Sequence, residues 1–446
     1  MEMLVGGRMK SYYQKVISTF TNKVSKTARK KIELALVYDP ERDFSRKRKL
    51  DMETLIRAIV FSSGKPIREE LYDYFDFNSD TATSSAFVQQ RAKLKPEAFE
   101  YVVKEFNKAY PCTETYKGFR LIAVDGSDLS ISFDPLDSET YKSNGNGVKG
   151  SNLIHINSAY DILNKRYVDT IIRGSKHTGE PYSMYTMAER FDGGKAIFIA
   201  DRNYSTWNNM EHIMKAGQFF LIRVQDIHSS TSNIRKFDLP DSEFDLDVET
   251  ILTTRQTKEI KAQPNKYRYL SKTSTFDFIS EDDPFYPVKY RAVRFRIDGT
   301  EEYESIMTNL DRDMFPADEI KKLYNLRWGI EVSFRHLKYS ADLSAIHARN
   351  RNSIRQEIWA RILLYNLCMI MIQEALKHKS KTLKFVYTLN ITRCIHIIRD
   401  NAKRKGGIPP DLEKLLWNEL LPIRPDRLDP RKVRHLSVVC FNYRFS

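Results

Sequence analysis

The sequence has few cysteines, and their spacing matches neither a metal cluster nor a disulfide framework. Four cysteines are spread over 446 residues, and no two stand in a Cys-x-x-Cys pair. This pattern argues against a zinc cluster of the usual spacing and against a small disulfide-stapled secreted domain. We therefore interpret the thiols as structural groups in a reducing, cytosolic compartment.

Long apolar runs are also missing. No stretch of 18 or more consecutive apolar residues occurs, so the sequence predicts no membrane span. Residues 1–31 lack the uninterrupted apolar segment and the cleavage site of a signal peptide. With 41% hydrophobic and 12% aromatic residues, the chain can instead bury a sizeable core. At about 150 residues per domain, its length allows roughly two to four domains.

Positive charge is present in excess. The chain has 72 Lys and Arg against 58 Asp and Glu, a formal net charge of +14. Such an excess indicates a polyanionic partner, either nucleic acid or, less readily, an acidic membrane surface. Basic residues gather at 46–49 near the N-terminus and between 424 and 434 near the C-terminus.

Two aspartates directly follow apolar runs that are typical of buried strands. Asp125 follows residues 122–124, and Asp201 follows residues 198–200. The elements expected between 119 and 224 come in the order strand, strand, strand, helix, strand, helix, strand, which is the order of a ribonuclease-H-like core. In that topology the first and fourth strands are adjacent. Asp125 and Asp201 are therefore expected to be neighbours.

A third stretch, residues 324–338, has the pattern of one amphipathic helix with a carboxylate on its polar stripe. At about 100° per residue, five polar side chains fall within about 80° of one another; they are Tyr324, Arg327, Glu331, Arg335 and Lys338. A separate apolar face contains Leu323, Leu326, Ile330, Phe334 and Leu337. Taken alone, the stretch also fits a surface helix with an Arg327–Glu331 ion pair. Three carboxylates on ordered elements of a basic chain instead indicate divalent metals acting on a phosphodiester.

These residues give the chain a resemblance to DDE transposases of the IS4 type. The helix signature of that family is Tyr, two residues, Arg, three residues, Glu, six residues and Lys, and the chain meets it in full. The first family aspartate precedes Gly, as Asp125 does, and the second stands between Ala and Arg, as Asp201 does. The resemblance covers roughly residues 115–370. One departure is the insertion before Glu331, which lacks the Trp that holds a flipped base in Tn5-like members.

The resemblance implies a two-metal site that cuts and joins DNA. Asp125 would bridge two Mg²⁺ ions, for which Mn²⁺ can substitute, and Asp201 and Glu331 would each complete one site. Tyr324, Arg327 and Lys338 would bind DNA phosphates. The implied fold is α/β, a ribonuclease-H-like mixed sheet with helices on both faces. It is interrupted by a β-rich insertion and flanked by helical N- and C-terminal regions.

Five regions are expected along the chain. Residues 1–112 form a helical, basic DNA-binding region, which is either a helix-turn-helix-like unit or a helical cap with a solvated basic surface. The catalytic core occupies 113–225 and 303–375, and the β-rich insertion occupies 226–302. A helical, basic C-terminal region follows at 376–446.

Several residues near the motifs are given other roles. Asp128, three residues after Asp125, is expected on the opposite face of the strand and not as a ligand. His155, His336 and His347 have no zinc spacing, and Trp328 is interpreted as a packing residue. Arg335 either contacts phosphate or pairs with Glu331.

The functional hypothesis is a transposase that cuts and joins the ends of its own insertion element. Its partners would be double-stranded DNA, as element ends and as target, and a second copy of the chain in the DNA complex. It would act in the bacterial cytoplasm at the nucleoid, with no membrane partner. The alternatives are a catalytically silent DNA-binding derivative of such an enzyme and a ribonuclease-H-like nuclease without strand transfer.

Overall fold

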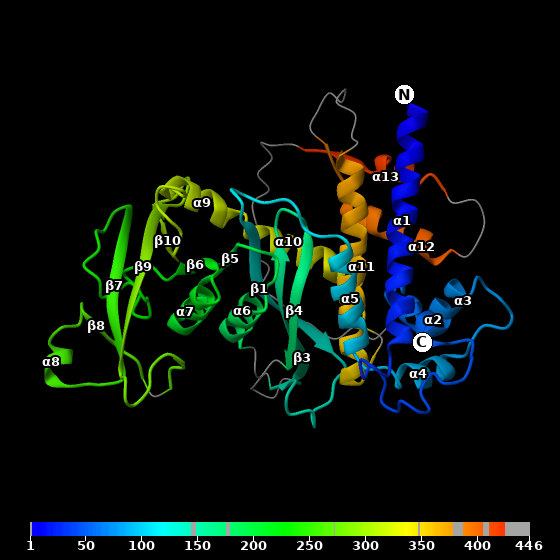
Figure 1. Ribbon diagram of the computed structural model, residues 1–446, viewed down its shortest axis with the longest axis horizontal. Helices are drawn as coiled ribbons and strands as arrows, with labels where there is room; N and C mark the ends of the chain where they lie inside the picture. The colour runs from blue at the N-terminus through cyan, green and yellow to red at the C-terminus, as the bar shows by residue number, and fades with distance from the viewer. Residues whose placement is uncertain are drawn as a thin grey trace.

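The computed structural model describes residues 2–143, 149–174, 179–271, 273–346, 348–377, 387–404 and 410–423. A helical bundle at one end, a mixed sheet in the middle and a strand-rich extension at the other end follow one another along the long axis (Figure 1). The loop expected at 144–147, His347 and the basic residues at 424–434 lie outside the described residues.

A mixed sheet forms the middle of the molecule. Five of its strands are β1 (Arg120–Ile131), β3 (Ser151–Asp161), β4 (Arg166–Gly174), β5 (Ala196–Ala200) and β6 (Phe219–Val224). They lie in the order β4-β3-β1-β5-β6. β3 runs antiparallel to both neighbours, and β1, β5 and β6 are mutually parallel. The expected adjacency of the first and fourth strands is therefore confirmed.

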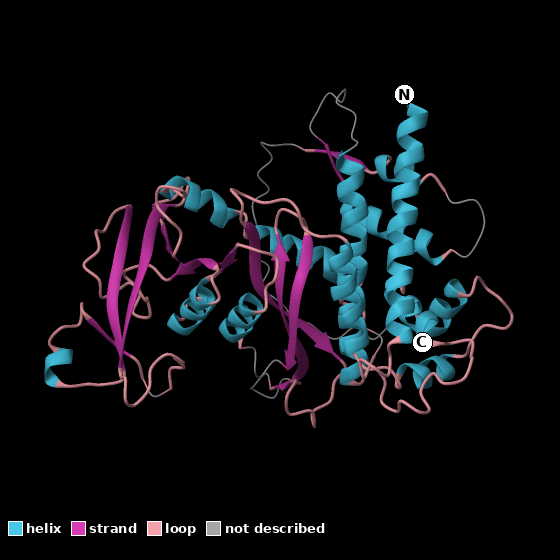
Figure 2. Cartoon of the chain, in the orientation of Figure 1, coloured by secondary structure: helices cyan, strands magenta, loops and turns pink. Residues whose placement is uncertain are grey.

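The segment between β6 and the glutamate helix extends this same sheet. Its strands are β7 (Phe244–Thr253), β8 (Tyr267–Tyr269), β9 (Phe285–Arg296) and β10 (Tyr303–Thr308), with a short helix α8 (Lys258–Lys261). β10 pairs with β6, and β9, β7 and β8 follow outward (Figure 2). A two-residue strand, β2 (Tyr141–Lys142), pairs with β3 at the opposite edge.

Hydrophobic residues cover both faces of the central strands. Ile122 and Val124 belong to a core with α6 (Glu180–Glu189) and α7 (Trp207–Lys215). Ala123 and Ile199 belong to a larger core that includes α9 (Ala317–Asn325), α10 (Trp328–Arg335) and α11 (Arg351–Lys377). Because side chains alternate along a strand, Asp125 lies on the face that α10 covers.

The N- and C-terminal helical regions pack around α11 (Figure 1). The other helices of this bundle are α1 (Glu2–Arg29), α2 (Met52–Val60), α3 (Ile67–Tyr74), α4 (Ser84–Arg91), α5 (Glu97–Ala109), α12 (Ile391–Lys403) and α13 (Leu412–Trp417). A small sheet joins β11 (Tyr387–Leu389) to β12 (Leu420–Pro422). α11 is long and apolar enough to cross a membrane, but 89% of its most apolar window is buried in the protein. We therefore describe it as the core helix of the bundle.

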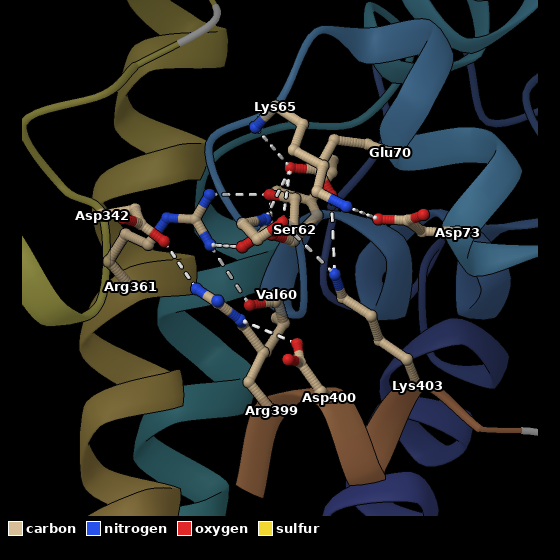
Figure 3. Close-up of polar contacts among 12 residues, drawn as sticks. Val60, Ser62, Lys65, Glu70, Asp73, Asp342, Arg361, Arg399, Asp400 and Lys403 are labelled. Carbon is tan, nitrogen blue, oxygen red and sulfur yellow. Dashed lines mark hydrogen bonds and ion pairs between the residues drawn. The ribbon is translucent and has the colours of Figure 1, made fainter. Parts of the chain in front are cut away.

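Polar contacts join α11 to the turn after α2, and α12 to the turn after η3 (Figure 3). The fully buried Arg361 of α11 donates from Nη1 to the carbonyl of Ser62 at 2.6 Å and from Nη2 to the Ser62 hydroxyl at 2.6 Å. Arg399 of α12 pairs with Asp342 at 2.5 Å. Since Arg361 lies out of water, losing its partner would leave a buried charge uncompensated. The helical regions are thereby fixed to the element that follows the glutamate helix.

Candidate active site

Adjacent parallel strands bring the two aspartates to the same edge of the sheet. Ile122 pairs with Phe198 and Ala123 with Ile199, a register offset of 198 − 122 = 76 residues. The same offset relates Asp125 to Asp201, since 201 − 125 = 76. Asp201 begins a short 3-10 turn, η2 (Arg202–Tyr204), and accepts a hydrogen bond from the Asn203 amide at 2.9 Å.

The glutamate lies on a helix that differs from the one expected. α9 ends at Asn325 and α10 begins at Trp328, so the prediction of one continuous helix over 324–338 is wrong. Leu326 lies at this junction and is 40% exposed, although the helical pattern placed it on the apolar face. Ile330 and Phe334 are buried as expected. α10 packs against β1 and places Glu331 on the side of the sheet that carries Asp125.

Electrostatic coupling links the three carboxylates. The pKa of Asp125 is raised to about 7, chiefly by burial and also by the charges of Asp201 and Glu331, while the Gly126 amide and the Arg327 guanidinium oppose the rise. A carboxylate in this setting is costly to ionise because it is partly desolvated beside like charges. A bound cation would relieve both effects.

Buried Arg327 pairs with Glu331, and Tyr324 lies beside the arginine, whose guanidinium is 5.7 Å from the centre of the phenol ring. Arg327 Nη2 lies 3.0 Å from Glu331 Oε1, and the arginine is only 6% exposed. Tyr324 is 2% exposed, and burial raises its pKa to about 12. The Arg327–Glu331 pair considered for a plain surface helix is therefore present, but the arginine in it is buried. A phosphate-binding role for these two residues stays a prediction.

Trp328 packs on Arg327 at the first turn of α10. It is 46% exposed, and the guanidinium of Arg327 lies 4.9 Å from the centre of its ring. The interpretation of Trp328 as a packing residue, and not as a base-stacking one, stays a prediction. A guanidinium at this distance makes a cation–π contact with the indole. The indole thus covers Arg327 from the solvent side.

Lys338 lies in a π-helical turn, η3 (His336–Ser340), that continues α10. π turns are rare and interrupt the regular angular spacing of side chains. The Nζ of Lys338 donates to the carbonyl oxygen of Asp128 at 2.9 Å, which joins the end of the helix to β1. Burial lowers the pKa of Lys338, and the charges of Asp128 and Asp125 oppose that shift. Its role toward DNA phosphate stays a prediction.

The opposite face of β1 carries a hydrogen-bonded cluster that the motif analysis missed. Asp128 lies on this face, as its position three residues after Asp125 predicts, and it is opposite His155 in the strand register. His155 Nδ1 lies 2.7 Å from Asp128 Oδ1, and Nε2 lies 3.4 Å from Glu180 Oε1. Burial opposes the charged imidazole, but the two carboxylates raise the pKa of His155 to about 9. The cross-strand register was the signal needed to find this cluster.

This cluster explains the glycine that follows Asp125. A Cβ at position 126 would lie 2.5 Å from Glu180 Oε1 and 2.6 Å from His155 Nε2. No side chain fits at those distances without displacing one of the two groups. Gly126 therefore allows His155 and Glu180 to pack directly behind Asp125.

Comparison with known proteins identifies the family. The family model for the transposase DDE domain matches residues 116–367, more than half of the chain. The chain belongs to the DDE transposase family. The match spans all three carboxylates, and it agrees with the resemblance read from the residues.

Two curated relatives are transposases of insertion elements. The probable transposase of insertion sequence element IS5377 from Geobacillus stearothermophilus is 21% identical over 270 residues, covering 60% of each chain. The transposase InsG of element IS4 from Escherichia coli K12 is 31% identical over 133 residues, 28% of this chain and 30% of that one. The DDE transposase described here thus spans at most 60% of the length of these relatives. The cryo-EM structure of a piggyBac transposase synaptic complex with hairpin DNA aligns over 94% of this chain and 88% of that one, with TM-score 0.45 and 11% identity.

The carboxylates of this DDE transposase are oxygen donors of the kind that hard divalent cations prefer. Among the described residues, no group of three or more His, Cys, Asp or Glu side chains is close enough together to hold one metal ion. The charges of Asp201 and Glu331 both raise the pKa of Asp125. Mg²⁺ is bound through one or two carboxylates and completes its shell with water and substrate phosphate oxygens.

Proposed function

We propose that this protein is a metal-dependent transposase that cuts the ends of its own insertion element and joins them to target DNA. The observation that carries the proposal is that Asp125 and Asp201 follow adjacent parallel strands, and that α10 with Glu331 packs against β1, in a chain of the DDE transposase family. The net charge of +14 supports a polyanionic substrate. The strand order β4-β3-β1-β5-β6 supports a ribonuclease-H-like core.

The proposed roles follow from the positions of the side chains. Asp125, Asp201 and Glu331 would hold two Mg²⁺ ions, which activate an attacking oxygen and stabilise a leaving oxygen in phosphodiester displacement. Asp125, whose pKa both other carboxylates raise, would be shared by the two ions. Arg327 orients Glu331 through its ion pair and keeps Asp125 more acidic. Lys338 ties η3 to β1 and would contact a phosphate beside the scissile bond.

The proposal extends to partners and location. Element ends and target DNA would be bound by a homodimer, in the bacterial cytoplasm at the nucleoid. Two competing functions are a DNA-binding derivative that no longer cuts and a nuclease that does not join. The complete set of carboxylates and the intact Tyr324–Lys338 signature favour an active enzyme over a silent derivative.

A cleavage and joining assay tests the proposal. Purified protein is incubated with a duplex that carries the terminal inverted repeat flanking the gene, with Mg²⁺ or with EDTA, and with a supercoiled target plasmid. We expect metal-dependent nicks at the repeat boundary and products in which the repeat is joined to the plasmid. Cleavage without joined products would favour the nuclease, and binding without cleavage would favour the silent derivative.

A further inference from the structure

The N-terminal helical region contains a basic pocket that is separate from the catalytic carboxylates. Its volume is about 360 Å³, and it lies between the loop 41–50 and the end of α4. Four cations line it against one carboxylate, Glu41; they are Arg42, Arg46, Arg48 and Lys93. This balance favours an anionic ligand.

Three of the four cations of the pocket have no ion-pair partner among the residues that the structure describes. Within the described ranges, Arg46, Arg48 and Lys93 form no ion pair, and the ion pair of Arg42 with Asp39 is long, at 3.8 Å. The next basic residue, Lys49, differs because it pairs with Asp80 at 2.5 Å. Free arginines beside one another repel, so an anion that bridges them gains charge-assisted hydrogen bonds and removes that repulsion.

The loop that carries these arginines is held in one shape. The backbone amide of Asp43 donates to the Asp39 carbonyl at 2.8 Å, and Asp43 Oδ2 accepts from the Asp39 amide at 2.8 Å. Phe44 has φ +55°, a left-handed conformation that is uncommon outside glycine, and its carbonyl accepts from Lys31 Nζ at 2.6 Å. A strained residue held by specific contacts is typical of a functional loop. The guanidinium groups are thus presented from a fixed backbone.

An amide side chain completes the lining of the pocket. Gln90 of α4 lines the pocket, and its side chain makes no hydrogen bond to any residue that the structure describes. Its N–H groups are therefore available to donate to a phosphate oxygen bound there. Its neighbour Arg91 is anchored to α11, with Nη1 2.8 Å from Glu357 Oε1 and Nη2 2.6 Å from the Ser353 carbonyl. The pocket is therefore fixed to the central helix of the protein.

We propose that this pocket binds backbone phosphates of duplex DNA away from the scissile bond. The inference rests on the proposed function, since it takes DNA as the substrate. Arginines bind phosphate by paired N–H donors without reading the bases. A duplex held here would be positioned relative to the carboxylates through α4 and α11.

Fluorescence anisotropy with a labelled random-sequence duplex tests the proposal, in metal-free buffer over a series of salt concentrations. The test variant is Arg46→Gln/Arg48→Gln in the full chain. The charge-matched control is Lys104→Gln/Lys108→Gln, which removes two exposed cations from α5 in the same region, each paired with a glutamate. Thermal melts verify that both variants fold, as expected for exposed positions.

We expect the pocket variant to bind at least about fivefold more weakly, with the slope of log K against log salt smaller by about 1.8. The control should stay within about twofold of the wild type. An equal effect in the two variants, or no effect in the pocket variant, would overturn the proposal. Displacement of the duplex by millimolar inorganic phosphate at constant ionic strength would assign the pocket to a free anion and would also overturn it.

The result is separable from the test of the proposed function. A wild type that cuts and joins element ends while the pocket variant binds normally would refute only the pocket. A wild type that neither binds nor cuts DNA would refute the proposed function, and the pocket assignment with it.

Discussion

Arg327 and Glu331 are joined by an ion pair of 3.0 Å across one turn of α10, and the arginine is almost fully buried. The same guanidinium lowers the pKa of Asp125. One guanidinium thus favours the charged form of two of the three carboxylates, Glu331 on a helix and Asp125 on a strand. Its absence would leave both with an uncompensated charge in a partly dry site.

Replacing Arg327 should shift the pH dependence of DNA cleavage. Ionised Asp125 is the form that binds metal, so activity should rise with pH through the pKa of this group, near 7. Arg327→Gln removes a positive charge that lowers the pKa of Asp125. The midpoint of the pH–rate profile should therefore move up by about one pH unit. Single-turnover cleavage rates across pH measure this. Arg335→Gln, an exposed change on the same helix, serves as control, and an unmoved midpoint in Arg327→Gln would contradict the electrostatic role.

Asp125 should destabilise the metal-free protein at neutral pH. Its folded pKa of about 7 is above the ordinary value of 3.8, so the folded state binds the proton more tightly and stability falls as pH rises between these values. Asp125→Asn removes this dependence. The variant should match the wild type near pH 3.8 and exceed it by on the order of 2 kcal/mol at pH 8. Urea unfolding at both pH values tests this, and a variant less stable than wild type at pH 8 would count against a desolvated carboxylate.

Gly126 and Gly329 should respond oppositely to a methyl group. In Gly126→Ala the new Cβ meets Glu180 and His155 at 2.5–2.6 Å, so we expect a loss of about 1–3 kcal/mol and slower cleavage. In Gly329→Ala the Cβ lies 3.6 Å from Ile162, an ordinary contact within a helix, and stability should be kept or raised by up to about 1 kcal/mol. Urea denaturation of the two variants gives the comparison. Equal stabilities would show that the space behind Asp125 is not limiting.

The adjacency of the two aspartate-bearing strands was predictable because it depends on the order of the strands and helices and not on individual side-chain contacts. Apolar runs before Asp125 and Asp201, and the order of elements between them, were sufficient to place the two strands together, as the register confirms. The helix signature likewise located Glu331 and its pairing with Arg327. The division of the chain into five regions stays a prediction.

The rest of the site depends on features that do not change the spacing of apolar residues in the sequence. The apolar residues of 323–337 keep a regular helical spacing in the sequence, which therefore predicts one helix. Neither the break between α9 and α10 nor the π turn at Lys338 interrupts that pattern. The Asp128–His155–Glu180 cluster joins three segments far apart in the chain: the β1–β3 register places Asp128 beside His155, and the packing of α6 on the sheet adds Glu180. The buried position of Arg361 was hidden for a similar reason, since its partners come from the turn after α2.

The central claim is that Asp125, Asp201 and Glu331 act as one unit on DNA. Single-turnover cleavage of a terminal-repeat duplex with Mg²⁺ tests it most directly, in Asp125→Asn, Asp201→Asn, Glu331→Gln and the Asp125→Asn/Glu331→Gln double variant. We predict that each single change lowers the rate by at least about 10³-fold, that the double variant is no slower than the singles, and that duplex affinity is kept. A single variant that still cuts at close to the wild-type rate would contradict the account.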